Sequence, residues 1–156
     1  LYVNTEKFFL DKPNKKRFQT YEALIYALDA YHSLSFDDRR FYFDPINKYF
    51  IPIYYDGKST ITNDIQKSKL KSLSNKISID AKKGASDAIR LINNIDHNKF
   101  KKKLVDFGID ILPENYEKII KRITTRLEVI MKADPLPVEF LQTKKSRKKY
   151  GKSVFQ

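Results

Sequence analysis

The side chains best suited to chemistry lie between residues 32 and 56. This stretch carries one of the two histidines, four aspartates and an arginine pair: His32, Asp37, Asp38, Arg39, Arg40, Asp44 and Asp56. Asp38 and Asp56 stand at the outer ends of two runs rich in aromatic and β-branched residues, 39–44 and 49–55. When two such runs pair as a hairpin, the two carboxylates meet at its open end. Oxygen ligands with positions left open for water and phosphate are what Mg²⁺ takes.

Aspartates at hairpin ends also have a purely structural use, because their side chains accept hydrogen bonds from nearby backbone amides. For either aspartate alone, this structural interpretation is the favoured one. The order of the elements favours a site instead: a helix, a polar loop with His32 and Asp38, a strand, a turn, a second strand and then Asp56. Protein kinases have this order in their catalytic lobe, with a metal-binding aspartate after the hairpin.

The segment HSLSFDDRRFYFDPINKYFIPIYYDG resembles the catalytic-lobe core of the CotH family of kinases, named for spore coat protein H, over about residues 20–60. The resemblance implies an α+β, mostly α fold that forms a protein-kinase-like catalytic lobe. It also implies phosphoryl transfer from ATP, with Mg²⁺ or Mn²⁺, to a protein or surface hydroxyl. Asp56, in the run PIYYD, becomes the counterpart of the metal-binding aspartate after the kinase hairpin. Asp38 takes the place of a second metal ligand, which is usually asparagine in the family.

The resemblance also indicates roles in the catalytic loop. His32, Ser33 and Asp37 are the candidates for orienting the acceptor hydroxyl. Apart from the resemblance, arginines can bind phosphate as bidentate donors, and since neighbours on a strand face opposite ways, at most one of Arg39 and Arg40 points into the site; Arg40 is the candidate for binding the nucleotide phosphates. Ser33 stands where the family carries its catalytic aspartate, so an active transferase and a catalytically inactive remnant both stay open. No glycine-rich phosphate loop precedes residue 20. We therefore expect a C-terminal fragment of a longer kinase, which by itself binds nucleotide poorly.

The elements that position these residues follow from composition and spacing. Thr20 is the expected N-cap of a helix over 20–31, which comes after a turn at 11–14 and a solvated basic cluster at 15–17. A hairpin is expected over 39–55, and its alternating aromatic side chains are expected to be core residues.

The second half of the chain reads as helical. Apolar residues at helical spacing predict helices at about 80–94, 97–107 and 113–132. The expected end signals are two N-caps, one glycine after the second helix and one proline in the first turn of the third: Asp80, Asp96, Gly108 and Pro113. Residues 1–133 then form the lobe, and residues 134–156 form a basic tail.

Composition limits the classes of protein and of site to which the chain can belong. The 156 residues carry 31 Lys+Arg against 19 Asp+Glu, a formal charge of +12, and no cysteine. The lack of cysteine excludes disulfides, thiolate metal sites and a cysteine nucleophile, and no apolar run is long enough for a transmembrane segment. Residues 1–60 hold nine basic and eight acidic side chains, so the positive excess lies in the helical part and the tail. A basic module that binds nucleic acid or an anionic surface is the second functional hypothesis.

Overall fold

The computed structural model describes residues 11–35, 37–62 and 77–134. Within them the protein is α+β and mostly helical, with one antiparallel two-stranded sheet. The elements, in chain order, are α2 (Lys12–Ala27), the 3₁₀ turn η1 (Tyr31–Leu34), β1 (Arg40–Asp44), β2 (Tyr49–Ile53), α4 (Ile79–Asn93), α5 (His97–Asp106) and α6 (Pro113–Lys132). The predicted basic tail, apart from its first residue, lies outside the described residues.

The three C-terminal helices begin and end within one residue of the predicted ranges. Asp96 is the N-cap of α5, and its side chain accepts a hydrogen bond of 3.0 Å from the Lys99 N–H. The predicted N-cap of α4 was wrong, because Ser78 holds that position and Asp80 lies in the first turn. Gly108 follows α5 with a φ of 74°, the left-handed conformation that ends many helices.

α2 begins eight residues before the predicted start. Asp11 is its N-cap and accepts a hydrogen bond of 2.8 Å from the Asn14 N–H, while Pro13 occupies the first turn, where its missing N–H is harmless. The predicted turn at 11–14 was therefore wrong, since the helix begins at Lys12. Residues 15–17 also lie in the helix, but their side chains remain at the surface as predicted, with Lys16 exposed and Lys15 and Arg17 partly exposed.

The C-terminal end of α2, at Ala27, comes four residues earlier than predicted. Asp29 leaves the helix in the left-handed region, with a φ of 56°, and its carboxylate accepts a hydrogen bond from the Thr60 hydroxyl. Arg126 of α6 is buried and donates to the free carbonyl oxygen of Ala27 at 2.7 Å. Burial lowers the pKa of the Arg126 guanidinium, and the charge of Asp29 acts in the opposite direction. This arginine therefore fastens α6 to the end of α2.

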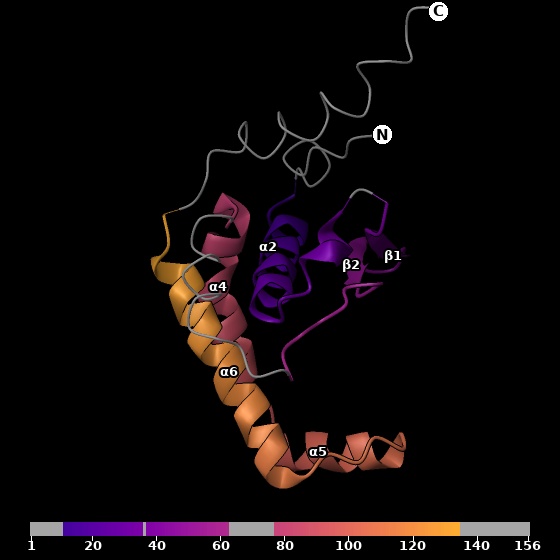
Figure 1. The fold of residues 1–156 in the computed structure, drawn as a ribbon. Coiled ribbons are helices and arrows are strands. Elements are labelled where there is room, and N and C mark those ends of the chain that lie inside the picture. The colour runs from indigo at the N-terminus through magenta and orange to yellow at the C-terminus, as the bar shows by residue number, and fades with distance from the viewer. Residues whose placement is uncertain (1–10, 36, 63–76, 135–156) are drawn as a thin grey trace, which may run out of the picture.

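The core lies where α2, α4 and α6 meet, with α2 between the hairpin and the α4–α6 pair (Figure 1). Its buried side chains are small or aliphatic: Ala23, Ala27, Ile61, Ile77, Ala81, Ala85, Ala88, Ile92, Ile123, Leu127, Ile130 and Ala133. The alanines let α2 and α4 approach closely. At Gly84 of α4 the approach is so close that a Cβ would lie 2.0 Å from the carbonyl oxygen of Gln19.

A buried carboxyl group also joins α2 to α4. Glu22 accepts a hydrogen bond of 2.7 Å from Ser78, the N-cap of α4, and only 7% of the glutamate is exposed. Burial raises the pKa of Glu22 to about 7, although the hydrogen bond from Ser78 and the charge of Arg39 lower it. The carboxyl group is thus held partly protonated near neutral pH.

The hairpin packs against α2 with one face. Its strands pair antiparallel, with Phe41 opposite Pro52 and Phe43 opposite Phe50. Asn14 of α2 is buried and binds the second strand at two points, donating to the Lys48 carbonyl oxygen at 3.1 Å and accepting from the Phe50 N–H at 2.9 Å. Tyr21 of α2 adds a third bond, from its hydroxyl to the Ile53 carbonyl oxygen at 3.1 Å, so side chains of α2 fix where the hairpin sits on the helix.

The prediction that the hairpin aromatics are core residues was only partly correct. Phe41 packs on the buried ring of Phe18, with 6.0 Å between the ring centroids. The exposed large side chains are Tyr42, Ile51 and Ile53 on the opposite face and Tyr54 and Tyr55 at the exit of β2. Phe43 is exposed as well, although it shares the face of Phe41. Among the described elements the second face of the sheet has no layer packed on it, because the helix that the hairpin contacts, α2, lies on its other side (Figure 1).

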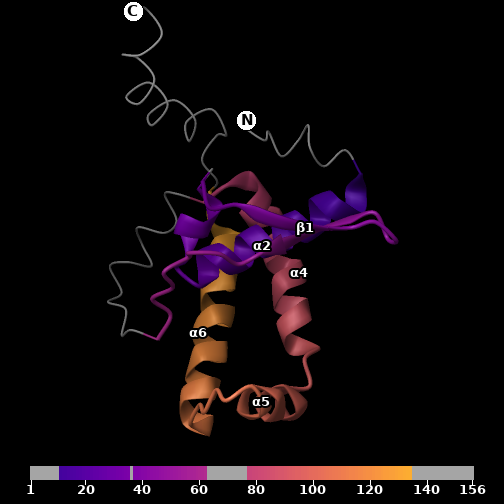
Figure 2. The same cartoon turned by 90° about the vertical axis from the view of Figure 1, so that its right-hand side faces the viewer.

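α5 stands apart from this core. It lies across the far ends of α4 and α6, away from α2 and the hairpin (Figure 2). None of its residues is buried, and Phe107 just after it is 80% exposed. Its contact with α6 runs through Tyr116, which packs against Phe100 and whose hydroxyl lies 2.6 Å from Nδ1 of His97. Among the described helices, none combines the length and the apolar character that crossing a membrane requires.

Candidate functional site

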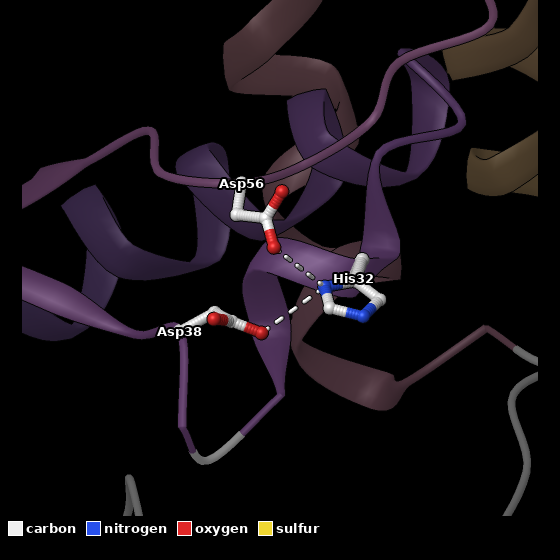
Figure 3. A group of neighbouring side chains, drawn as sticks. All are labelled: His32, Asp38 and Asp56. Carbon is white, nitrogen blue, oxygen red and sulfur yellow. Dashed lines mark ion pairs between the residues drawn. The ribbon is translucent and has the colours of Figure 1, made fainter.

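Three of the predicted site residues come together at the open end of the hairpin. Nδ1 of His32 lies 3.0 Å from a carboxylate oxygen of Asp38 and 3.8 Å from one of Asp56 (Figure 3). One donor atom from each residue lies within 4.8 Å of the other two. The hairpin thus places the residues before its first strand and after its second strand close together, as the sequence predicted.

The position of Asp38 follows from a tight turn between η1 and β1. The Ser35 hydroxyl donates to the carboxylate of Asp38 at 2.5 Å, and the Ser35 carbonyl oxygen accepts from the N–H groups of Asp38 and Arg39 at 3.2 and 3.1 Å. Nε of Arg39 also donates to the Leu34 carbonyl oxygen at 2.7 Å. These bonds hold the Asp38 carboxylate toward η1, where His32 is.

The position of Asp56 follows from a left-handed backbone at the exit of β2. Its φ is 42°, a conformation that aspartate tolerates better than most residues. Gly57 comes next and is buried under the ring of Tyr54, where a Cβ would lie 2.4 Å from the ring carbon Cε2. The Asp56-Gly57 pair therefore lets the chain turn sharply and aims the carboxylate back at His32.

The electrostatics of the site are those of two carboxylates around one imidazole. Asp38 is largely shielded, with 15% of its side chain exposed, whereas His32 and Asp56 are about half exposed, at 50% and 42%. Two close carboxylates repel unless a positive charge lies between them. A protonated His32 or a divalent cation supplies that charge. Lys58, with Nζ 3.9 Å from Asp56, adds a weaker one.

The other predicted site residues lie around this cluster in different roles. Ser33 is fully buried and its hydroxyl donates to the Ala30 carbonyl oxygen at 3.0 Å. Asp37 is exposed, and its carbonyl oxygen accepts a hydrogen bond of 2.7 Å from Nη1 of Arg40. The guanidinium of Arg40 lies 4.8 Å from the centre of the Tyr55 ring. Asp37 and Arg40 therefore lie at the surface of the loop, whereas the Ser33 hydroxyl faces the interior.

Comparison with family models, with curated proteins and with solved structures found no match to this chain. The resemblance to the CotH family therefore stays a prediction.

Sequence reasoning assigned the metal role to Asp38 and Asp56 and gave His32 to the catalytic loop. The structure shows that the imidazole nitrogen is the member that both carboxylates contact. Lys58 was missed, although its position two residues after Asp56 is a signal that could have been used. A donor set of two carboxylates and one imidazole, open to solvent on one side, suits a divalent cation with free positions for water and phosphate.

Proposed function

We propose that this chain carries the metal-binding part of a CotH-like phosphotransferase with a protein-kinase-like catalytic lobe. The observation that supports the proposal is the convergence of Asp38 and Asp56 beside His32 at the open end of the hairpin. In a kinase lobe, two side chains at these places hold the cation that neutralises the nucleotide phosphates. That cation is Mg²⁺ or Mn²⁺ in this proposal, with ATP as the phosphoryl donor.

The roles proposed for the site residues follow from how exposed each side chain is. Asp38 and Asp56 hold the cation in this proposal, and Arg40, exposed at the start of β1, is the proposed group that binds a phosphate oxygen. Asp37 is the exposed carboxylate of the same loop and is the proposed group that orients the acceptor hydroxyl of a protein or surface substrate. Ser33 has no part in it, because its buried hydroxyl is used by the Ala30 carbonyl.

Cation binding tests this proposal most directly. Titration of the chain with Mn²⁺, followed by the loss of the free-ion signal in electron paramagnetic resonance, should show one site. Asp56→Asn should weaken binding by about tenfold or more, or 1.4 kcal/mol. Asp44→Asn is the matched control, because Asp44 lies at the other end of the hairpin, where it accepts hydrogen bonds from Ile46 and Asn47. Equal affinity in wild type and Asp56→Asn would remove Asp56 from the proposal.

Phosphoryl transfer needs a second test. The protein that contains this chain should label itself or an added protein with radioactive phosphate from ATP, and Asp56→Asn should abolish the labelling. Intact Mn²⁺ binding without any labelling would instead support an inactive, kinase-like remnant. The 3.0 Å pair of His32 and Asp38 favours that second candidate, because the imidazole gives the carboxylate a partner without an ion.

A further inference from the structure

The position of His32 bears on which cation the site selects. Resting on the function proposed above, the geometry points to His32 as a direct metal ligand through Nδ1, which makes this a mixed nitrogen and oxygen site for Mn²⁺ or Zn²⁺ rather than for Mg²⁺. Mg²⁺ takes oxygen ligands almost exclusively, whereas imidazole suits first-row transition ions. Asp38 and Asp56 alone would form an oxygen-only pair that also suits Mg²⁺.

The distances within the cluster match shared coordination. Ligand bonds of about 2.1 Å place two atoms on one ion about 3.0 Å apart at a right angle and about 4.2 Å apart on opposite sides. Nδ1 of His32 lies 3.0 Å from Asp38 and 3.8 Å from Asp56, and the third pair lies within 4.8 Å. The three side chains therefore need only a small closing movement to bind one ion.

Three separate backbone segments supply the three donors. η1 carries His32, the turn fixed by Ser35 carries Asp38, and the left-handed exit of β2 carries Asp56. Two of these segments are held by contacts outside the cluster. The hydrogen bond from Arg39 to Leu34 holds the segment of Asp38, and the packing of Gly57 under Tyr54 holds the segment of Asp56. The donors are thus positioned by the fold and not only by their attraction for one another, which lowers the cost of binding an ion.

The imidazole can change from hydrogen-bond donor to ligand without leaving its place. With the proton on Nδ1, the imidazole can donate to the Asp38 carboxylate, 3.0 Å away, whereas Asp56 at 3.8 Å lies beyond hydrogen-bond distance. When Nδ1 binds an ion, the proton moves to Nε2, which lies on the side of the ring away from both aspartates (Figure 3). The side chain of His32 is half exposed, so water can accept a hydrogen bond from Nε2. Lys58 is 69% exposed and free to swing away from Asp56 when the ion enters.

Nuclear magnetic resonance of the imidazole nitrogens tests this inference without any activity measurement. The chain contains two histidines, so His97→Asn assigns the remaining signals to His32. One equivalent of Zn²⁺ should shift Nδ1 of His32 and place the proton on Nε2, while His97, whose Nδ1 lies at the Tyr116 hydroxyl, should keep its signals. Zinc binding that leaves both His32 nitrogens unchanged, or that shifts the nitrogens of His97 equally, would overturn the inference.

Competition between cations, measured in the wild type and in two matched histidine variants, is the second test. Mn²⁺ or Zn²⁺ should displace Mg²⁺ at roughly a hundredth of its concentration in the wild type. His32→Asn keeps a donor toward Asp38 but removes the imidazole, so it should lower Zn²⁺ affinity by about tenfold or more and change Mg²⁺ affinity by less than about threefold. His97→Asn should change neither affinity.

The two ideas fail in different ways. If His32→Asn binds every cation as the wild type does, while Asp56→Asn loses them all, His32 is no ligand and the proposed phosphotransferase site still stands. If the wild type binds no divalent cation, both proposals are lost. Circular dichroism of each variant confirms that the helical fold is intact before affinities are compared.

Discussion

Glu22 shows how one buried side chain links the fold to pH. Its folded-state pKa of about 7 lies above the ordinary 4.5, because burial disfavours the charged carboxylate. Below pH 4 the group is protonated in both the folded and the unfolded state, so it does not alter the free energy of unfolding. Between about pH 4.5 and 7 the unfolded state loses its proton first, and stability falls as the pH rises.

Glu22→Gln should therefore stabilise the protein at alkaline pH. Its amide oxygen still accepts the Ser78 hydrogen bond, but it has no charge to bury, so the free energy of unfolding at pH 8 should rise by an amount on the order of 3 kcal/mol. At pH 4 the two proteins should be alike. Urea unfolding across this pH range measures the difference. The exposed Glu128, changed to Gln, is the control and should alter the free energy by less than about 0.5 kcal/mol.

For single residues, the sequence was enough to predict that Asp38 and Asp56 come together, but not which side chains they contact. Asp38 and Asp56 could be placed together because a hairpin joins the two ends of its strands. That Nδ1 of His32 lies between them depends on η1 and on the turn at Ser35, whose geometry leaves no periodic signal in the sequence. The buried state of Ser33 could not be predicted for the same reason, since it depends on the packing of η1 against α2.

At the scale of the elements, the contact between α2 and α4 depends on the absence of a side chain at Gly84. A methyl group there would meet the backbone of Gln19 and Thr20, neither of which can move without shifting α2. Gly84→Ala should lower the free energy of unfolding by about 3 kcal/mol, despite the gain of about 1 kcal/mol that alanine brings to a helix interior.

Ser86→Ala, at an exposed position of the same helix, changes helix propensity without a steric clash and so separates the two effects. It should stabilise the protein slightly, because alanine is the better helix former and the position is exposed. Chemical denaturation of the two variants and the wild type measures whether each substitution raises or lowers the free energy of unfolding. A Gly84→Ala protein as stable as the wild type would mean that α2 and α4 lie further apart than described.

The helices also show where sequence patterns suffice. The long apolar stripe of α6 and the end signals of α5 predicted both helices to within a residue, because each signal is local. The start of α2 was missed because the run DKPN carries the signals of a turn and of a capped helix alike. Tertiary contact decides between them, since Asn14 is buried where it binds the hairpin. The exposed aromatic face of the hairpin could not be predicted, because alternation does not say which face has a partner.

On the scale of the whole molecule, stability should be unevenly distributed. α2, α4 and α6 share one buried cluster, whereas α5 contributes no buried residue and lies across the distal ends of two helices (Figure 2). Amide hydrogens of α5 should therefore exchange with solvent at least about a hundredfold faster than those in the middle of α6, through local opening. Hydrogen exchange followed by mass spectrometry measures this. Equal protection in α5 and α6 would show that α5 opens only with the whole fold.

The bond from Arg126 to the Ala27 carbonyl has a consequence for the order of folding. It joins residues 99 positions apart, and the Gln19–Asp80 bond spans 61. The hairpin, in contrast, closes through its four-residue connection between β1 and β2. Distant pairings must overcome a larger loss of chain entropy before any burial repays it, which slows folding. We therefore expect the hairpin to form early and the helical core later, once α2 has met α4 and α6, which follow much further along the chain.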